Sequence, residues 1–262
     1  MKFNRQLLIA SFAAAFLILP LAAFAHQPRL ATGNETVVTN PEISKAYYAK
    51  LAGGPQYYRI SSAAPFDLYV NILAPDIAGQ KKDISAEIVK DNRTDAPLAV
   101  LDGMKFDWKY FWEPFGHDGY WMGPEYRAKA EAGEYVIKVW SANNDSKYSL
   151  AVGEIEAFNF TESAKAINLI PRLKRDFFNE SPAGFIFSPF GWGYIILMYA
   201  LVFIIELIVW LAVRKRSFLQ NQLLINYQST IINSFIAIGV ILLIVAIMTT
   251  WNPVLIFLSG AA

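Results

Sequence analysis

The chain contains two histidines, and the position of each suggests metal chemistry. His26 follows an A-F-A triplet at residues 23–25, the pattern that signal peptidase cleaves, so cleavage would make His26 the first residue of the mature chain. A terminal histidine offers its amine and its imidazole, and a further imidazole completes the histidine brace that suits Cu(II). His117 is the other histidine available for this role. Copper held by His26 and His117 is one expectation, and a hydrogen-bonded loop histidine beside Asp118 is the alternative for His117.

Residues 106–126 combine that second histidine with a high density of aromatic side chains. Trp and Tyr carry a large apolar face and a polar edge, so they could stack on sugar rings or bury the surface of a partner. The same rings could instead cap one end of a protein core, with the glycines of the segment forming its turns. The residues expected to form a binding loop are Trp108, Tyr110, Trp112, His117, Asp118, Tyr120 and Trp121.

Acidic residues in and beside this segment allow a catalytic alternative. Two carboxyl groups placed across a cleft would suit a glycan-active or other hydrolytic enzyme. However, the sequence contains no glycine-rich phosphate loop and no H-E-x-x-H, G-x-S-x-G or calcium-loop motif. The leading expectation is therefore that the chain is a non-catalytic binding or accessory subunit without a cofactor. The acids concerned are Asp102, Asp107, Glu113, Asp118 and Glu125.

The elements that must position these residues are predicted to be β-strands. Apolar residues alternate in runs rich in aromatic and β-branched side chains, bounded by Gly, Pro, Asn and Asp. A turn-forming cluster at residues 142–145 joins the last two runs into a β-hairpin. About seven short strands in roughly 130 residues favour an antiparallel β-sandwich or jelly roll for residues 26–158. The runs lie at residues 56–60, 66–73, 85–90, 98–101, 134–141 and 147–156.

The sequence of this hairpin resembles a known family. It reads G-E-Y-V-I-K-V-W-S at residues 133–141 and K-Y-S-L-A-V at 147–152, like the closing strands of pre-peptidase C-terminal-like β-sandwich modules. Those modules also open with a strand similar to Y-Y-R-I at 57–60, followed by an alternating strand similar to 66–72. The resemblance, over residues 55–156, implies a sandwich that binds or stabilises without catalysis. The chain differs in its inserted segment 106–126 and in having no attached peptidase, so specialised function is expected in the insertion.

Three apolar stretches predict an envelope location. Residues 1–25 have the basic start, apolar run and A-F-A end of a signal peptide. Residues 192–213 are long enough to cross a bilayer, and the R-K-R triplet that follows orients this helix from outside to inside. Residues 214–229 then form a cytoplasmic loop, residues 230–250 return as a second transmembrane helix, and 251–262 lie at the outer interface. The expected location is the plasma membrane of a bacterium or archaeon, with the sandwich outside the cytoplasm.

The region between the sandwich and the membrane, residues 159–191, has amphipathic character. Ile167, Ile170, Leu173 and Phe177 recur at helical spacing within residues 164–178, with basic residues largely opposite. Such a helix could rest on the outer leaflet of the bilayer or pack against the sandwich, and the pattern leaves both open. Inside the first transmembrane stretch, Glu206 needs a polar partner, either local or from another membrane subunit.

The amino-acid composition excludes several classes of function and of binding site. With 23 basic and 22 acidic residues, the net charge of +1 offers no electrostatic basis for binding nucleic acid. The chain has no cysteine, so disulfides, thiolate metal sites and a cysteine nucleophile are excluded. Stability must therefore come from a packed core.

Overall fold

The computed structural model describes residues 26–91, 93, 96–188, 191, 193, 204 and 208. The chain divides into two compact units, one of residues 22–181 and one of residues 1–21 with 182–262. The second unit contributes a short 3₁₀ helix, η1 (Pro182–Phe187). The predicted signal peptide, Glu206, the loop 214–229, the second transmembrane stretch and the outer tail lie outside the described residues, as does most of 192–213. Within the described part, no helix has the length and apolar character needed to cross a bilayer.

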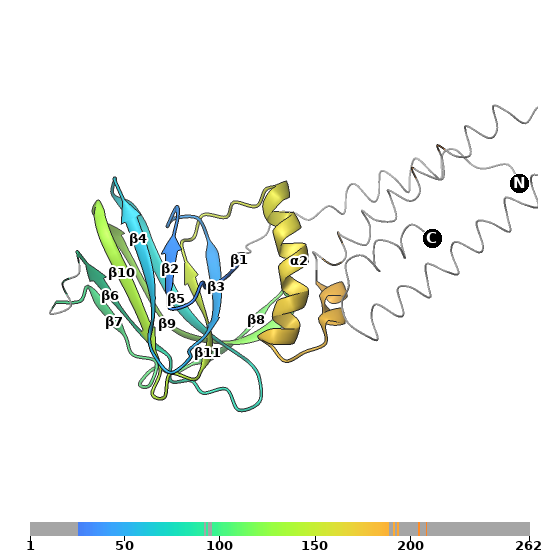
Figure 1. Cartoon of the computed structure of the whole chain (residues 1–262), viewed down its shortest axis with the longest axis horizontal. Helices are drawn as coiled ribbons and strands as arrows, with labels where there is room; N and C mark the ends of the chain where they lie inside the picture. The colour runs from blue at the N-terminus through green and yellow to red at the C-terminus, as the bar shows by residue number, and fades with distance from the viewer. Residues whose placement is uncertain are drawn as a thin grey trace, which may run out of the picture. The chain divides into compact units, whose positions relative to one another are not determined.

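Residues 27–152 fold into two facing sheets, which confirms the predicted β-sandwich (Figure 1). One sheet has six strands in the order β1-β3-β11-β5-β9-β8, and the other has five in the order β2-β4-β10-β6-β7. The pairs β1/β3 and β2/β4 are parallel, and the other pairs are antiparallel. The strands are β1 (Gln27–Leu30), β2 (Glu35–Val38), β3 (Lys45–Lys50), β4 (Gln56–Ser62), β5 (Phe66–Pro75), β6 (Ser85–Lys90), β7 (Ala99–Leu101), β8 (Lys109–Glu113), β9 (Asp118–Ala130), β10 (Gly133–Trp140) and β11 (Lys147–Val152).

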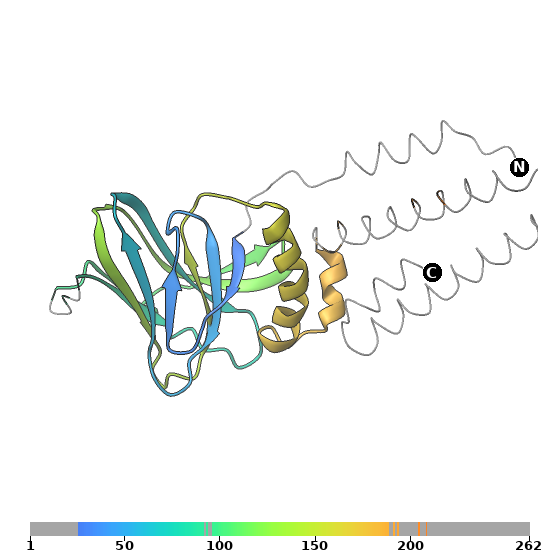
Figure 2. The ribbon, with the colours of Figure 1, turned by 45° about the horizontal axis from the view of Figure 1, so that its top comes forward.

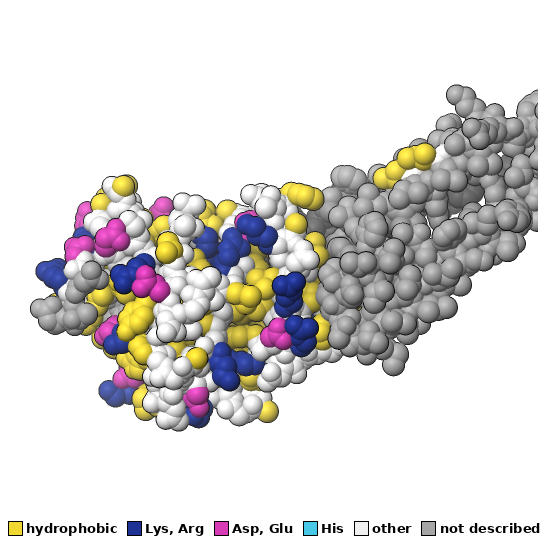
Figure 3. Space-filling model, viewed as in Figure 1, with side chains coloured by type: hydrophobic (Ala, Val, Ile, Leu, Met, Phe, Trp, Pro, Cys, Tyr) yellow, Lys and Arg dark blue, Asp and Glu magenta, His cyan; other side chains and the backbone are white. Residues whose placement is uncertain are grey.

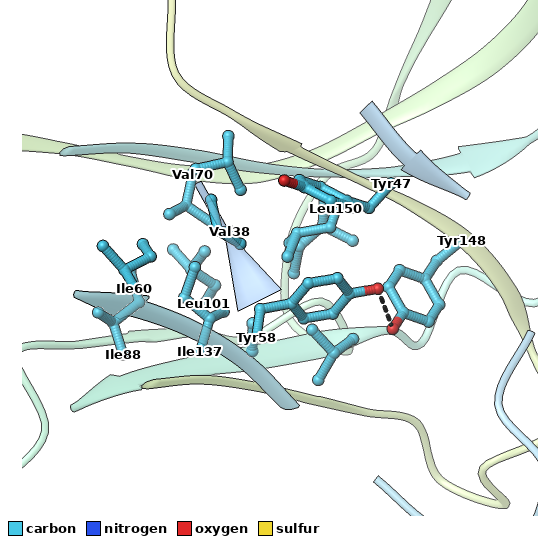
Figure 4. Packing of buried hydrophobic residues seen from close by; sticks show 14 of the residues in the cluster. Val38, Tyr47, Tyr58, Ile60, Val70, Ile88, Leu101, Ile137, Tyr148 and Leu150 are labelled. Carbon is cyan, nitrogen blue, oxygen red and sulfur yellow. Dashed lines mark hydrogen bonds between the residues drawn. The ribbon is translucent and has the colours of Figure 1, made fainter. Parts of the chain in front are cut away.

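The core lies between the sheets and follows from the alternation along the strands. On β10, Tyr135, Ile137 and Val139 are buried, as the sequence predicts. Strand β11 contributes Tyr148, whose hydroxyl shares a 2.9 Å hydrogen bond with that of Tyr58 (Figure 4). Each buried hydroxyl thus has a partner, which removes most of the cost of burying it.

The structure contains strands that the sequence pattern did not reveal. All six predicted runs are strands, but β1, β2, β3, β8 and β9 are additional. The segment 106–126, expected to be a loop, contains β8 and most of β9. The glycines of the segment were expected to form turns, but β9 accommodates Gly123 and Pro124 at a bulge between the pairs Asn71–Glu125 and Leu73–Met122. The Asn71 amide donates to the Gly123 carbonyl at 3.2 Å.

Helix α2 (Phe160–Asp176) covers the outer face of the six-stranded sheet (Figure 2). Its start is capped by the Asn159 side chain, which accepts a 2.9 Å hydrogen bond from the Glu162 N–H. Leu173, with Phe177 just beyond the helix, packs on Tyr120 and its neighbours in the sheet. Lys165, Arg172 and Arg175 are exposed, and Figure 3 shows basic side chains on the surface of this helix. Of the two positions that the sequence left open, the helix therefore occupies the one against the sandwich.

Candidate ligand-binding site on the β8–β9 hairpin

Strands β8 and β9 form a hairpin at one edge of the six-stranded sheet. Tyr110 pairs with Trp121, and Glu113 pairs with Asp118 across a turn of residues 114–117. Because β8 is the edge strand, side chains on both of its faces reach solvent: on one face Tyr110 is 52% and Trp112 45% exposed, and on the other Phe111 is 36% exposed. Large aromatic side chains this exposed are unusual in a folded domain and mark a candidate interaction surface.

Tyr110, Trp112 and Trp121 lie on one face of the hairpin and are called the aromatic platform here. They share a face because Tyr110 and Trp112 are two residues apart and Trp121 is directly opposite Tyr110. The Tyr110 and Trp121 rings meet edge to face at 5.7 Å. The Trp121 indole N–H donates to the Asp76 carboxylate at 2.9 Å, and the Lys82 ammonium lies 3.6 Å from the centre of its ring. These contacts hold Trp121 and leave Tyr110 and Trp112 as the exposed rings.

Other residues of the predicted binding loop are buried and support the platform. Trp108 inserts into the core and donates its indole N–H to the Gly103 carbonyl at 2.7 Å. Gly123 makes room for this ring, because a Cβ there would lie 2.6 Å from Trp108. Tyr120 faces α2 and shares a 2.9 Å hydroxyl hydrogen bond with Tyr48. The prediction that rings of this segment cap the core therefore holds for Trp108 and Tyr120, and the prediction of a binding surface now concerns the exposed Tyr110 and Trp112.

A buried ion pair joins the turn of the hairpin to the end of α2. Lys174 donates to the Asp118 carboxylate at 2.8 Å and to the His117 carbonyl at 3.2 Å, and the two charged side chains are 1% and 4% exposed. Glu180 approaches the same ammonium at 3.6 Å. Burial raises the pKa of Asp118 to about 7, Lys174 opposes this rise, and the nearby Glu180 and Glu113 carboxylates add to it. Sequence reasoning missed Lys174, because its charge on an amphipathic helix was assigned to the exposed face.

The candidate catalytic acids are engaged within the protein. Glu113 accepts a hydrogen bond from the Phe115 N–H at 2.8 Å, and burial raises its pKa. Asp102 accepts bonds from two backbone N–H groups of its own turn, and Glu125 accepts one from the Tyr69 hydroxyl at 2.9 Å. Asp107 is exposed. Since Asp118 is shielded from solvent and paired with Lys174, it cannot reach a substrate in this arrangement.

The two histidines do not come together. His26 precedes β1 at one edge of the six-stranded sheet, where its Nδ1 hydrogen-bonds the Ser44 hydroxyl and burial lowers its pKa. His117 lies in the turn at the opposite edge, with its ring 4.7 Å from that of Trp112. Helix α2 spans the separation: Glu162 pairs with Arg29 of β1, and Lys174, roughly 18 Å along the helix axis, holds the turn. The residues present therefore do not fit a shared brace.

The described residues also contain no group of three or more His, Cys, Asp or Glu side chains arranged to hold a metal ion. A brace further requires the free amine of His26, which exists only after cleavage before that residue. The sequence-based copper site thus has no counterpart in the described geometry.

Comparisons with known proteins give similarities to solved structures over about half of the chain. No protein-family model and no curated protein sequence matches the chain. Among solved structures, the pre-peptidase C-terminal domain of a Bacillus anthracis collagenase is similar at 8% identity, over 50% of this chain and 97% of that domain, with a TM-score of 0.27. A surface-associated copper-binding protein of Methylomicrobium album BG8 is similar at 9% identity, over 47% and 98%, with a TM-score of 0.24. The catalytic domain of a GH87 α-1,3-glucanase matches at 14% identity, over 43% and 22%, with a TM-score of 0.23. The first of these similar structures is a pre-peptidase C-terminal domain, the family that the hairpin sequence was found to resemble.

Proposed function

We propose that the chain is a membrane-anchored, extracytoplasmic binding module without catalytic activity, and that the aromatic platform is its ligand surface. The observation that carries the proposal is the exposure of Tyr110 and Trp112 on a hairpin that the buried contacts of Trp108 and Asp118 hold in place. A rigidly held surface loses little conformational freedom on binding, which favours affinity. The membrane anchor in this proposal rests on the apolar stretches at 192–213 and 230–250.

The chemistry of the platform suits saccharide rings. Exposed Tyr and Trp faces can cover the apolar face of a sugar, and polar groups beside them can meet its hydroxyls. The Asp76 carboxylate and the Lys82 ammonium stand at Trp121 and supply such groups. A module outside the plasma membrane also encounters glycan chains of the cell wall, which makes the wall polymer the natural first ligand to test.

The geometry favours binding over hydrolysis. A glycosidase requires two carboxyl groups that both reach the sugar from opposite sides. Here Asp118 is buried against Lys174, and its cross-strand neighbour Glu113 is held by the backbone of the turn. A platform that stacks on a sugar without flanking reactive groups retains its ligand rather than cleaving it.

Co-sedimentation of the detergent-solubilised full chain with isolated peptidoglycan sacculi tests this proposal. Replacing both exposed rings, Tyr110→Ala with Trp112→Ala, removes the stacking surface and is expected to weaken binding about 10-fold or more. The control is Phe160→Ala, which removes an aromatic ring that is 83% exposed on α2. Failure of the unaltered chain to bind sacculi would exclude the proposed ligand, and equal binding by the double variant would exclude the platform as its site.

A further inference from the structure

Strand β8 leaves one edge of the six-stranded sheet without a partner strand in the described part of the chain. It pairs with β9 on one side only, so backbone N–H and C=O groups on its other side point away from the sheet. Such an edge is a template for another strand. Protected edges are usually very short or carry proline and charge, whereas the centre of β8 consists of the consecutive aromatic residues Tyr110, Phe111 and Trp112.

The sequence of β8 is complementary to itself when two copies run antiparallel. With Phe111 on the two-fold axis, Lys109 of one copy lies opposite Glu113 of the partner subunit, and Tyr110 lies opposite Trp112 of the partner subunit. Opposite charges and paired aromatic rings are the cross-strand combinations that stabilise antiparallel sheets. The register therefore matches ring with ring at the centre of the strand and a basic with an acidic residue at its ends, where the Glu113 carboxylate also accepts from the Phe115 N–H of its own turn.

The other three sheet edges lack this complementarity. Strand β7 has only three residues, and β1 contains Pro28, which has no N–H to donate. Strand β2, with the sequence E-T-V-V, would place Glu35 opposite an apolar Val38 in an antiparallel self-pair. The match is thus a property of β8 and does not follow from being an edge strand.

We infer that two copies of this chain associate through antiparallel pairing of β8 about a two-fold axis at Phe111, which joins their six-stranded sheets into one. The interface is isologous, since the same strand serves both copies. Directly opposite residues share a face of the sheet, so Tyr110 and Trp112 of both copies form one continuous aromatic surface. The inference goes beyond the proposed function and does not depend on any ligand.

Disulfide trapping tests the register directly, because the natural chain has no cysteine. In an antiparallel pair, opposite Cα atoms lie about 4.5–5.5 Å apart, within the range that a disulfide bridges. Phe111→Cys in the full chain is expected to convert most of the protein to a covalent dimer under mild oxidation. The control is Val100→Cys, at a position 56% exposed on the edge strand β7, which is expected to stay monomeric. No more dimer with Phe111→Cys than with the control would overturn the inference.

A charge-exchange experiment separates loss of pairing from loss of folding. Phe111→Lys and Phe111→Glu each place like charges across the axis, so each variant alone is expected to be monomeric by light scattering in detergent. Mixing the two variants sets Lys opposite Glu and should restore a dimer. A monomeric unaltered chain at tens of micromolar, single variants that remain dimeric, or a mixture that remains monomeric would each contradict pairing through β8.

Discussion

The Asp118–Lys174 pair is the most consequential interaction between single residues that the structure adds to the sequence. Both side chains are almost fully buried where α2 meets the hairpin turn, and Glu113 and Glu180 lie close to them. Removing a carboxylate and an ammonium from water is costly, and one ammonium serves several acids here. The turn beside the platform is therefore held by Asp118, whose carboxyl group has a raised pKa and changes its charge with pH.

The contribution of Asp118 to the stability of the folded chain should fall as the pH rises from about 4 to about 7. The pKa of Asp118 is about 7 in the folded state and 3.8 without the fold, so between these values the folded state holds a proton that the unfolded state has released. The contribution of Asp118 to the free energy of unfolding then falls with rising pH, with a slope of up to about 1.4 kcal/mol per pH unit. Asp118→Asn should remove this contribution, so that between about pH 4 and 7.5 the free energy of unfolding falls less with pH than in the unaltered chain. Urea unfolding followed by tryptophan fluorescence measures the difference.

The matched control is Asp145→Asn, because Asp145 forms an exposed ion pair with Lys81 on a surface turn. This variant should keep the pH dependence of the unaltered chain, since exposed pairs contribute little. If the slope persists in Asp118→Asn, another group is responsible for it.

Helix α2 shows how one amphipathic pattern can fit two surroundings. The spacing of Ile170, Leu173 and Phe177 predicts a helix with one apolar face, but both a bilayer and a sheet would bury that face. In the structure the sheet does so, since Leu73 and Ala151 offer an apolar outer face. The choice depends on strands distant in the sequence.

Leu173→Ala should destabilise the sandwich by about 2–5 kcal/mol, because it leaves a cavity between α2 and the sheet. Thermal unfolding of the full chain, followed by near-ultraviolet circular dichroism, measures this change. Phe160→Ala at the exposed start of α2 is the control, with an expected change of about 0.5 kcal/mol or less. Equal effects of the two substitutions would contradict packing of Leu173 on the sheet.

At the level of the whole molecule, the separation of His26 from His117 determines what copper binding can look like. If the two histidines formed a brace, His117→Ala would remove a direct copper ligand and lower the affinity for Cu(II) 10-fold or more. Because the two residues lie at opposite edges of the sheet, this substitution should leave the affinity of the mature chain for Cu(II) within about 2-fold. Competition with a chelator measures the affinity for Cu(II). A loss of about 10-fold or more in His117→Ala would show that the two imidazoles share a metal.

The predicted topology can be tested with the same cysteine-free chain. Val37→Cys on β2 should react fully with a membrane-impermeant maleimide in intact spheroplasts, because the sandwich is expected outside the plasma membrane. Ser217→Cys, in the predicted cytoplasmic loop, should react only after the membrane is permeabilised. Labelling of both positions, or of Ser217→Cys alone, would contradict the orientation drawn from the R-K-R triplet.

Local periodicity predicted much of the fold and part of the candidate site. Alternation along residues 134–140 and 147–152 identified the hairpin and its buried face, because the side-chain period of a strand is a local property. The same reasoning missed β9, since Gly123 was assigned to a turn, whereas it lies in a bulge where its carbonyl accepts from Asn71 of a neighbouring strand. It located the aromatic segment but could not separate supporting rings from exposed ones.

The sequence alone determined the all-β character of residues 27–152, the amphipathic helix after it and the concentration of aromatic residues near the second histidine. The tertiary structure decided that Trp108 and Tyr120 are buried while Tyr110 and Trp112 are exposed, that Lys174 meets Asp118, and that His26 is far from His117. The physical reason is that strand and helix patterns arise from neighbours along the chain. Burial, ion pairing and shared sites depend on strand order, which brings distant residues together or keeps them apart.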